Sequence, residues 1–249
     1  MLSVLLLTSA AFLAGALNAA AGGGTFLTFP ALVFLGMAPI PANATSTVAV
    51  LPGYMSSALA FRREIGPAGT TGVWALVLAA LAGGLVGAWL LLVTPARVFS
   101  GVVPWLLLAA TALFAAGPRL TAWARGRAHG EMASRPATLL AVFAVAVYGG
   151  YFNGGLGILL LAAFGLLGLT DLNHMNGLKN LLSAVLTVIS AATFAAAGIV
   201  AWREAALMAV AATAGGYIGG RVARRVPADA LRAGIVAVGL AMSVLFFLR

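Results

Sequence analysis

Residues 1–61 contain no charged side chain, and residues 136–170 form a second uncharged run. Hydrophobic residues make up 63% of the chain and charged residues 8%, whereas a soluble domain carries about 25% charged residues. A chain of 249 residues cannot bury so much apolar surface against itself, so lipid must surround most of these side chains. A transmembrane β-barrel would require alternating polar and apolar residues, and these segments are apolar on all sides. The sequence therefore predicts an all-α, polytopic helical membrane protein.

About ten apolar segments can be marked along the chain. Several contain about 20 residues, which is enough to cross the hydrocarbon core of a bilayer. The first two segments of each half are shorter, and each short pair forms either two tilted spans or one re-entrant hairpin. These pairs meet at residues 18–24 and 153–157. The predicted segments are 1–17, 23–37, 43–61, 70–93, 98–116, 137–152, 156–169, 175–197, 204–220 and 233–248.

The two halves of the chain carry the same landmarks in the same order. The offset between partners stays between 132 and 135 residues, and four of the six asparagines belong to such pairs. A duplicated hydrophobic unit is typical of secondary transporters with internal repeats, whose substrate site lies where the repeats meet. The landmarks Asn18, Gly22, Asn43, Phe61, Gly83, Gly84, Gly87 and Pro95 correspond to Asn153, Gly157, Asn176, Phe194, Gly215, Gly216, Gly219 and Pro227.

The arginines predict how the segments are oriented. If the N-terminus lies outside and the crossings alternate, ten arginines fall inside and three outside, a clear positive-inside bias. Counting each short pair as one crossing weakens the bias to about eight against five. The basic connection follows the third segment in the first half and the fourth segment in the second, so the bias switches sides. This switch predicts two inverted-topology repeats, 1–116 and 137–249, a basic cytoplasmic linker at 117–136, and both termini outside.

The glycine-rich tips between the short segments are the first candidates for substrate binding. Gly22 and Gly23 lie in one tip and Gly157 in the other. Glycine lets the backbone approach a ligand closely, and a helix that begins there points unpaired N–H groups and its positive end at the ligand. Alternatively, these glycines only allow close helix packing. Packing is the favoured role for the glycines of the fourth segments: Gly83, Gly84, Gly87, Gly215, Gly216 and Gly219.

Amides and hydroxyls inside the apolar segments are the second group of candidates. Asn18 and Asn153 adjoin the tips, where they either cap the broken helices or donate to substrate. Asn43 and Asn176 open the third segment of each half, so they are candidates for helix caps as well as for ligand contacts. The hydroxyls that follow offer donors for a ligand or for bonds between helices. They belong to Thr45, Ser46 and Thr47.

Lys179 is the only lysine of the chain, and it lies beside Asn180 inside the eighth predicted segment. An ionisable residue within a membrane segment is by default a functional-site hypothesis, here as a partner for an anionic substrate. The alternative is that its side chain extends along the helix to the nearby surface. Asp171 and His174 precede that segment and could titrate in proton-coupled transport. Capping and a solvated loop are the favoured roles for these two residues.

These motifs resemble the TauE/SafE family of membrane permeases, the sulfite-exporter or toluene-sulfonate-uptake family. The resemblance is carried by the run from Asn18 through the glycines to Phe26, by Pro41-Ala-Asn-Ala-Thr-Ser-Thr47, and by the echo Asn176-Gly-Leu-Lys-Asn180. It covers nearly the whole chain. It implies transport of sulfur-containing organic or inorganic anions across a bacterial inner membrane, with a substrate that varies among members.

The predicted function is therefore a secondary transporter that moves a small anion, a sulfonate or a sulfite-like sulfur oxyanion, by alternating access. Export is slightly favoured, because an anion that leaves a negative interior gains about 2.3 kcal/mol per charge per 100 mV. The expected partners are the small anionic substrate and membrane lipid, without nucleic acid, and a homodimer is a possible assembly. A non-transporting membrane scaffold or assembly factor is the alternative.

Enzymatic function is not expected from this composition. The chain has no cysteine, two histidines and five acidic residues, and the acidic residues are scattered among the connections. No arrangement of them forms a nucleophile with its base, an acid–base pair or a metal cluster inside the apolar segments. No cofactor and no metal are predicted.

Overall fold

The computed structural model of the chain describes residues 2–20, 24–126, 133–222 and 228–247. Over these residues the chain forms ten α-helices and one short 3₁₀-helix, which confirms the predicted all-α fold. The helices are α1 (Leu2–Ala20), α2 (Thr25–Phe34), α3 (Pro39–Ala60), η1 (Arg62–Glu64), α4 (Val73–Val93), α5 (Ala96–Gly126), α6 (Arg135–Tyr151), α7 (Leu156–Leu166), α8 (Leu172–Ala196), α9 (Trp202–Val222) and α10 (Ala228–Phe247).

Each predicted segment contains one helix, but several boundaries differ from the prediction. α3 begins at Pro39 with Ala38 as its N-cap, and proline is favoured in the first turn, where its missing N–H costs nothing. α5 continues to Gly126, well beyond the predicted end at 116, although Gly117 and Pro118 favoured a helix end there. α8 begins after Asp171, whose side chain accepts a hydrogen bond of 2.9 Å from the Asn173 N–H, so the capping role favoured for Asp171 is confirmed.

The helices differ in whether they can cross a membrane. Within the described part of the chain, three are long and apolar enough by length and composition: Val73–Val93, Ala96–Gly117 within α5, and Leu172–Ala196. By contrast, α2 has 10 residues and α7 has 11. At about 1.5 Å per residue they reach about half of the 30 Å hydrocarbon core. Most side chains of both helices are buried, so they contribute to the interior of the bundle.

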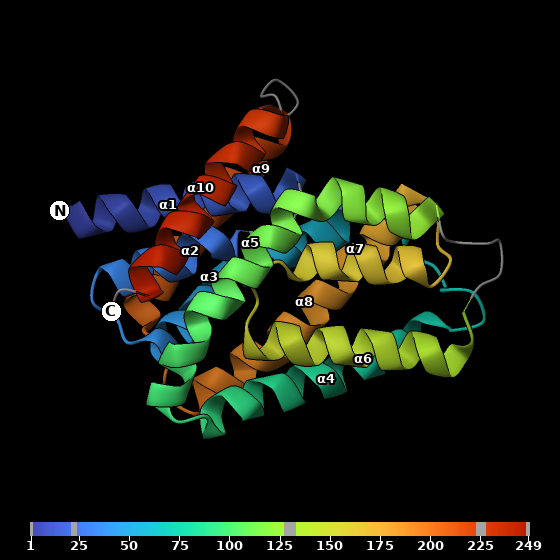
Figure 1. Cartoon of the computed structure of the whole chain (residues 1–249), viewed down its shortest axis with the longest axis horizontal. Helices are drawn as coiled ribbons and strands as arrows, with labels where there is room; N and C mark the ends of the chain where they lie inside the picture. The colour runs from blue at the N-terminus through green and yellow to red at the C-terminus, as the bar shows by residue number, and fades with distance from the viewer. Residues whose placement is uncertain (1, 21–23, 127–132, 223–227, 248–249) are drawn as a thin grey trace.

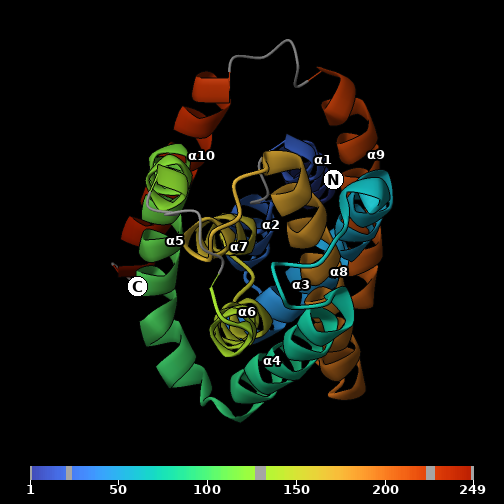
Figure 2. The ribbon, with the colours of Figure 1, turned by 90° about the vertical axis from the view of Figure 1, so that its right-hand side faces the viewer.

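The two short helices lie in the middle of the bundle. α2 packs against α1, α3 and α10, and α7 packs against α5, α6 and α8. Figure 2 shows α2 and α7 near the centre, with α5 and α10 on one side and α3, α8 and α9 on the other. In Figure 1, α1 begins at the left and α6 at the right, and the following helix turns back towards the same end. The N- and C-termini both lie towards the left of that view.

Glycines line the two closest helix pairs, α1 with α9 and α4 with α6. A Cβ at Gly83 would overlap the backbone carbonyl of Phe143, and one at Gly215 would overlap that of Phe12. Small residues allow helix backbones to approach in this way inside a membrane. The predicted packing role is confirmed for Gly83, Gly84, Gly87 and Gly215. Gly219 lies outside the residues whose surroundings the structure describes.

Candidate functional site

The interruption between α6 and α7 lies at the centre of the molecule. α6 ends at Tyr151 and α7 begins at Leu156. Between them Gly155 has φ 75°, a left-handed conformation that glycine adopts without a steric penalty. The Tyr148 hydroxyl donates to the Gly154 carbonyl at 2.5 Å, which holds the turn against α6. The backbone therefore turns sharply inside the bundle, and the Gly154 carbonyl is bonded to α6.

Asn153 joins this turn to three other helices, and it is 1% exposed. Its Oδ1 accepts from the Tyr54 hydroxyl of α3 at 3.1 Å, and its Nδ2 donates to Thr187 Oγ1 of α8 at 3.3 Å. Its backbone carbonyl accepts from Thr25 Oγ1, at the start of α2, at 3.2 Å. The helix pairs α1–α2 and α6–α7, which we call the two hairpins, thus meet at Asn153. We call this meeting point, residues 152–155 with the start of α2, the junction.

The first hairpin has its own asparagine at the interruption. Asn18 Oδ1 accepts from the backbone N–H of Gly24 at 2.8 Å, and Gly24 is the N-cap of α2. Asn18 therefore takes the capping role, one of the two predicted for it. Gly22 and Gly23 lie outside the described residues. Gly157 is buried in the first turn of α7.

Asn43 and Asn176 are not helix caps, contrary to that prediction. The N-caps are Ala38 for α3 and Asp171 for α8, so both asparagines lie in the second turn with their amides free to bond elsewhere. Asn43 Nδ2 donates to the backbone carbonyl of Tyr151 at 3.0 Å. Tyr151 is the last residue of α6. Asn43 therefore links α3 to the edge of the junction.

The three hydroxyls that follow Asn43 all bond to the protein. Ser46 and Thr28 of α2 share a hydrogen bond of 2.6 Å. Thr45 Oγ1 accepts from the Ala201 N–H, just before α9, at 3.0 Å. Thr47 donates to the carbonyl four residues before it at 2.8 Å. Two of the three hydroxyls thus connect helices, and the third stays within α3.

Lys179 lies inside the bundle, away from the junction. Its side chain is 6% exposed, so it does not extend to the surface as the alternative interpretation required. Its Nζ donates to Asn176 Oδ1 at 3.0 Å, and Asn176 Nδ2 in turn donates to the Leu172 carbonyl at 2.9 Å. Asn180, beside it, is 4% exposed. The predicted residues therefore form two groups, one at the junction and one in the first turns of α8.

The helix η1 covers the start of α8. A Cβ on Gly177 would press on the backbone of Glu64, so the two segments are in close contact. Among the described residues, Glu64 Oε2 and His174 Nε2 are buried without a hydrogen-bond partner. His174 lies within α8 and not in the solvated loop that the sequence favoured for it.

Four polar residues of this network were not singled out from the sequence. Thr25 directly follows the first glycine-rich tip, which is a signal that could have identified it. Tyr54 and Thr187 are 133 residues apart, the offset that relates the asparagines of the third segments. Pairing polar residues at that offset would have found both. The fourth is Thr28, which no sequence pattern marks.

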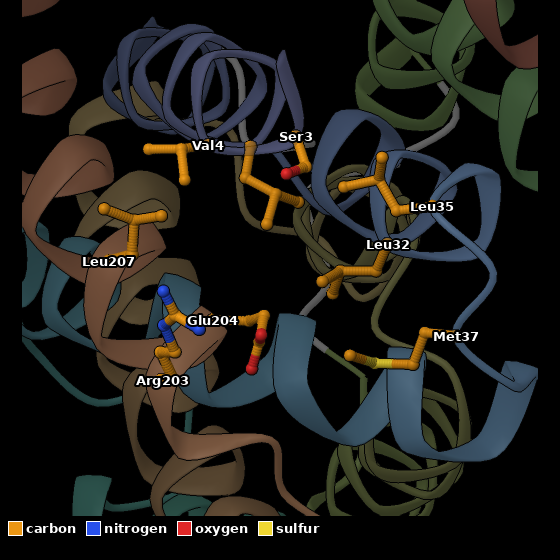
Figure 3. Close-up of a pocket in the computed structure, with 9 residues that line it drawn as sticks. Ser3, Val4, Leu32, Leu35, Met37, Arg203, Glu204 and Leu207 are labelled. Atoms are coloured by element: carbon orange, nitrogen blue, oxygen red, sulfur yellow. The ribbon is translucent and has the colours of Figure 1, made fainter. Parts of the chain in front are cut away.

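A pocket of about 250 Å³ opens at the end of the molecule where α1 begins. Figure 3 shows Arg203 and Glu204 of α9 on one side of it, with apolar side chains of α1 and α2 above and opposite. None of the predicted site residues lines it. Its lining consists of Ser3, Val4, Leu7, Leu32, Leu35, Met37, Arg203, Glu204 and Leu207.

Comparison with known proteins identifies the family. The sequence model described as "Sulfite exporter TauE/SafE" matches residues 7–246, which is nearly the whole chain. The chain belongs to the TauE/SafE family. The resemblance inferred from the glycine-rich tips and the duplicated asparagines is therefore confirmed.

Relatives that the chain matches over most of its length carry transporter names. The chain is 30% identical over 234 residues to "Probable membrane transporter protein YfcA" of Escherichia coli K12, covering 94% of this chain and 85% of the relative. It is 28% identical over 241 residues to "Probable membrane transporter protein ORF9" of a Sinorhizobium species, covering 94% and 88%. No solved structure matches the chain. TauE/SafE is a transporter family and not an enzyme family, as the composition led us to expect.

Proposed function

We propose that this TauE/SafE protein is a secondary transporter that moves a sulfonate or a sulfite-like sulfur oxyanion across a bacterial inner membrane by alternating access. The observation that carries the proposal is the meeting of the two hairpins, where Thr25 of the first donates to the Asn153 carbonyl of the second. Transporters with discontinuous helices bind their substrates at such breaks near the bilayer midplane. The family description, a sulfite exporter, supports the substrate class.

The helix packing supports two inverted repeats, 1–116 and 137–249. Suppose that each helix of the first half corresponds to the helix numbered five higher, so that α1 corresponds to α6 and α4 to α9. Replacing both helices of one observed packing pair by their counterparts then gives another observed packing pair. The pair α1–α9 becomes α6–α4, the pair α3–α9 becomes α8–α4, and the pair α5–α7 becomes α10–α2, and all six pairs occur. The hairpins also start from opposite ends in Figure 1. A two-fold axis in the membrane plane would produce both features.

The lengths of α2 and α7 support the alternative in which each hairpin is re-entrant and does not cross the membrane twice. Helices α2 and α7 cover only about half of the hydrocarbon core, and both begin at the junction with their N-termini there. Phe29 of α2 packs edge-on against Phe152 at 5.6 Å between ring centroids, which closes the apolar side of the junction. An oxyanion placed between the two N-termini would receive backbone N–H groups and the positive ends of two helix dipoles.

The substrate contacts that we propose combine neutral donors with one formal charge. In the present structure the amides and hydroxyls near the junction bond to each other, so an entering oxyanion would replace protein partners. Lys179 would add a positive charge on one side, which makes the path asymmetric. The proposed substrate-binding residues are Asn18, Gly22, Gly23, Asn43, Thr45, Ser46, Thr47, Asn153, Gly157, Asn176, Lys179 and Asn180.

The orientation follows from the arginines, with both termini outside. In that orientation the pocket beside Arg203 opens to the outside, and η1 lies at the cytoplasmic end. Export needs no coupling ion, because the membrane potential alone drives an anion out of the cell. The five carboxylates lie in connections or near helix ends, and of them only the Glu64 Oε2 is buried without a hydrogen-bond partner among the described residues, which supports transport without a relay of several buried carboxylates.

The test measures ligand binding by the purified protein in detergent. We expect one sulfur oxyanion or sulfonate from a panel of sulfite, sulfate, thiosulfate, taurine, sulfoacetate and carboxylates to stabilise it, by about 2.7 kcal/mol at a hundred times its dissociation constant. Uptake of that anion into proteoliposomes should then saturate, as expected of a carrier. A protein that neither binds nor moves any anion of the panel would contradict the proposal and favour the membrane scaffold.

A further inference from the structure

A row of buried polar side chains follows one face of α8 from its first turns to the junction. Lys179, Ser183 and Thr187 are four residues apart, so they lie above one another on the same face of the helix. They are 6%, 1% and 0% exposed. At about 1.5 Å per residue, the row extends about 12 Å. The position that corresponds to Ser183 in the first half is the apolar Val50, so the row belongs to one half only.

Ser183 differs from its two neighbours in the row. Lys179 bonds to Asn176, and Thr187 bonds to Asn153. The Ser183 hydroxyl is buried, and it has no hydrogen-bond partner among the described residues. Leaving a buried hydroxyl unpaired costs folding free energy, so the position is unfavourable for the protein alone and favourable once a ligand accepts from it.

Another buried serine of α8, Ser190, forms its hydrogen bonds within the protein. Ser190 donates to the Leu186 carbonyl at 2.8 Å and to the Gly84 carbonyl of α4 at 3.3 Å. Both serines are buried on α8, and they lie seven residues apart, or two helical turns. The hydroxyl of Ser190 therefore holds two helices together, whereas that of Ser183 is available.

We propose that this face of α8 lines the substrate path between the junction and the cytoplasmic end, and that the Ser183 hydroxyl donates to an oxygen of the passing oxyanion. The inference rests on the proposed transport function and adds Ser183 and Thr187 to its contacts. Side chains four residues apart on a helix are about 6 Å apart at their Cβ atoms. A sulfur oxyanion with three or four acceptor oxygens can thus bond to the Lys179 ammonium and the Ser183 hydroxyl at once.

The arrangement also predicts which ligands pass. The buried Lys179 ammonium favours anions over cations and neutral solutes, because only an anion compensates its positive charge. Two donors at a fixed spacing favour an anion with several oxygens over a spherical halide, since each unmade hydrogen bond is costly in a buried site. The path therefore selects sulfonates and sulfur oxyanions over chloride.

The absence of cysteine from the sequence allows a direct test of the path. A Ser183→Cys variant carries a single thiol, which reacts with the small sulfonate reagent 2-sulfonatoethyl methanethiosulfonate. The thiolate attacks the sulfenyl sulfur, displaces methanesulfinate and forms a mixed disulfide. In inside-out membrane vesicles we expect labelling of Ser183→Cys and none of Ser190→Cys, the matched control on the same helix. No labelling of Ser183→Cys, or equal labelling of both variants, would overturn the proposal.

The charge of the path is tested with a pair of reagents. The anionic reagent should label Ser183→Cys at least about tenfold faster than its trimethylammonium counterpart, because a positive group in a narrow path concentrates anions. The preference should fall by about the same factor when Lys179→Gln is added. A preference for the cationic reagent, or one that Lys179→Gln leaves unchanged, would contradict the role of this face.

Protection by substrate separates this inference from the proposed function. Sulfate, sulfoacetate and taurine do not react with the reagents, and a transported one should slow the labelling of Ser183→Cys severalfold. Labelling that is anion-selective but that none of them slows would support the path and contradict the sulfur-containing substrate class. In proteoliposomes, Ser183→Ala should raise the KM for the transported anion without lowering the thermal stability, whereas Ser190→Ala should lower the stability. An unchanged KM in Ser183→Ala would overturn the proposed hydrogen bond.

Discussion

Asn153 is the residue on which the junction most depends, because it bonds to α2, α3 and α8 at once. Its side chain satisfies Tyr54 and Thr187, and all three residues are buried. In a buried environment, forming a hydrogen bond stabilises the protein less than removing one of its two partners destabilises it. Substitutions at this position should therefore be judged by the groups they leave without a partner.

Asn153→Ala is expected to lower the free energy of unfolding by about 1–3 kcal/mol, because it leaves two buried polar groups unpaired. Tyr54→Phe is the matched control. It removes one hydroxyl from the same network and should cost about 0.5–1.5 kcal/mol. Thermal unfolding in detergent measures both. An Asn153→Ala variant as stable as the parent would show that the network does not hold the hairpins together.

Lys179→Met keeps most of the side-chain volume and removes the buried charge. We expect anion affinity to fall by about 10- to 100-fold, which corresponds to the 1.5–3 kcal/mol of a hydrogen bond to a charged group. The stability without ligand should be unchanged or higher, since a buried charge is costly. The control is Arg97→Met, at an exposed residue in the first turn of α5. The measurement is the affinity of each variant for the anion that stabilises the protein. Equal affinity in both variants would exclude Lys179 from the site.

The sequence identified the asparagines and Lys179 as buried polar groups but did not identify their partners. Asn18 and Asn153 were recognisable because they recur at the glycine-rich tips. Thr187 was not, since a threonine in an apolar helix commonly bonds to its own preceding turn. Its contact with Asn153 depends on how α8 rotates against α7, which is decided by packing.

At the scale of helices, two of the interfaces between the halves, α1 with α9 and α4 with α6, depend on glycines that lack a side chain. The interface of α4 with α6 places Gly87 against the Val147 carbonyl and the Tyr151 N–H. The Tyr151 carbonyl is also the acceptor for Asn43. Close packing of α4 and α6 thus positions the end of α6, from which the junction begins.

Gly87→Ala is expected to destabilise the protein by about 1–3 kcal/mol, because its Cβ would overlap the backbone of α6 and force the helices apart. Gly101→Ala is the matched control, since Gly101 lies in α5 with no atom near its Cβ position. That substitution should stabilise the protein by about 0.5–1 kcal/mol. Unfolding midpoints in detergent distinguish the two, and equal effects would contradict the proposed close approach.

The existence and order of the ten helices could be predicted from hydropathy, because most of the apolar runs are flanked on at least one side by glycine, proline or arginine. The partners of the helices could not. The α1–α9 pair joins segments nearly two hundred residues apart, and glycine is too common in this chain to show which glycine faces which backbone. The start of α3 was misplaced because Asn43 resembled a cap, whereas Pro39 fits the first turn better.

At the scale of the whole molecule, the repeats place alternate connections on opposite sides of the membrane. Arg97, in the first turn of α5, and Thr70, between α3 and α4, are both exposed and should lie on opposite sides. In intact cells with a permeable outer membrane, an impermeant maleimide should label Arg97→Cys and not Thr70→Cys. Inside-out vesicles should reverse the result, and labelling of both variants from one side would contradict the inverted orientation.

The pairing of α1 with α9 has a consequence for synthesis of the protein in the cell. α1 leaves the ribosome well before α9, its main partner, which is completed only after residue 222. At about 5–20 residues per second, this takes roughly 10–40 s. During that time α1 sits in the bilayer with its glycine-lined face covered only by lipid or by an insertion factor. In a truncated chain that stops before α9, this face would stay without its partner, and we expect membrane proteases to degrade such a chain faster than the full one.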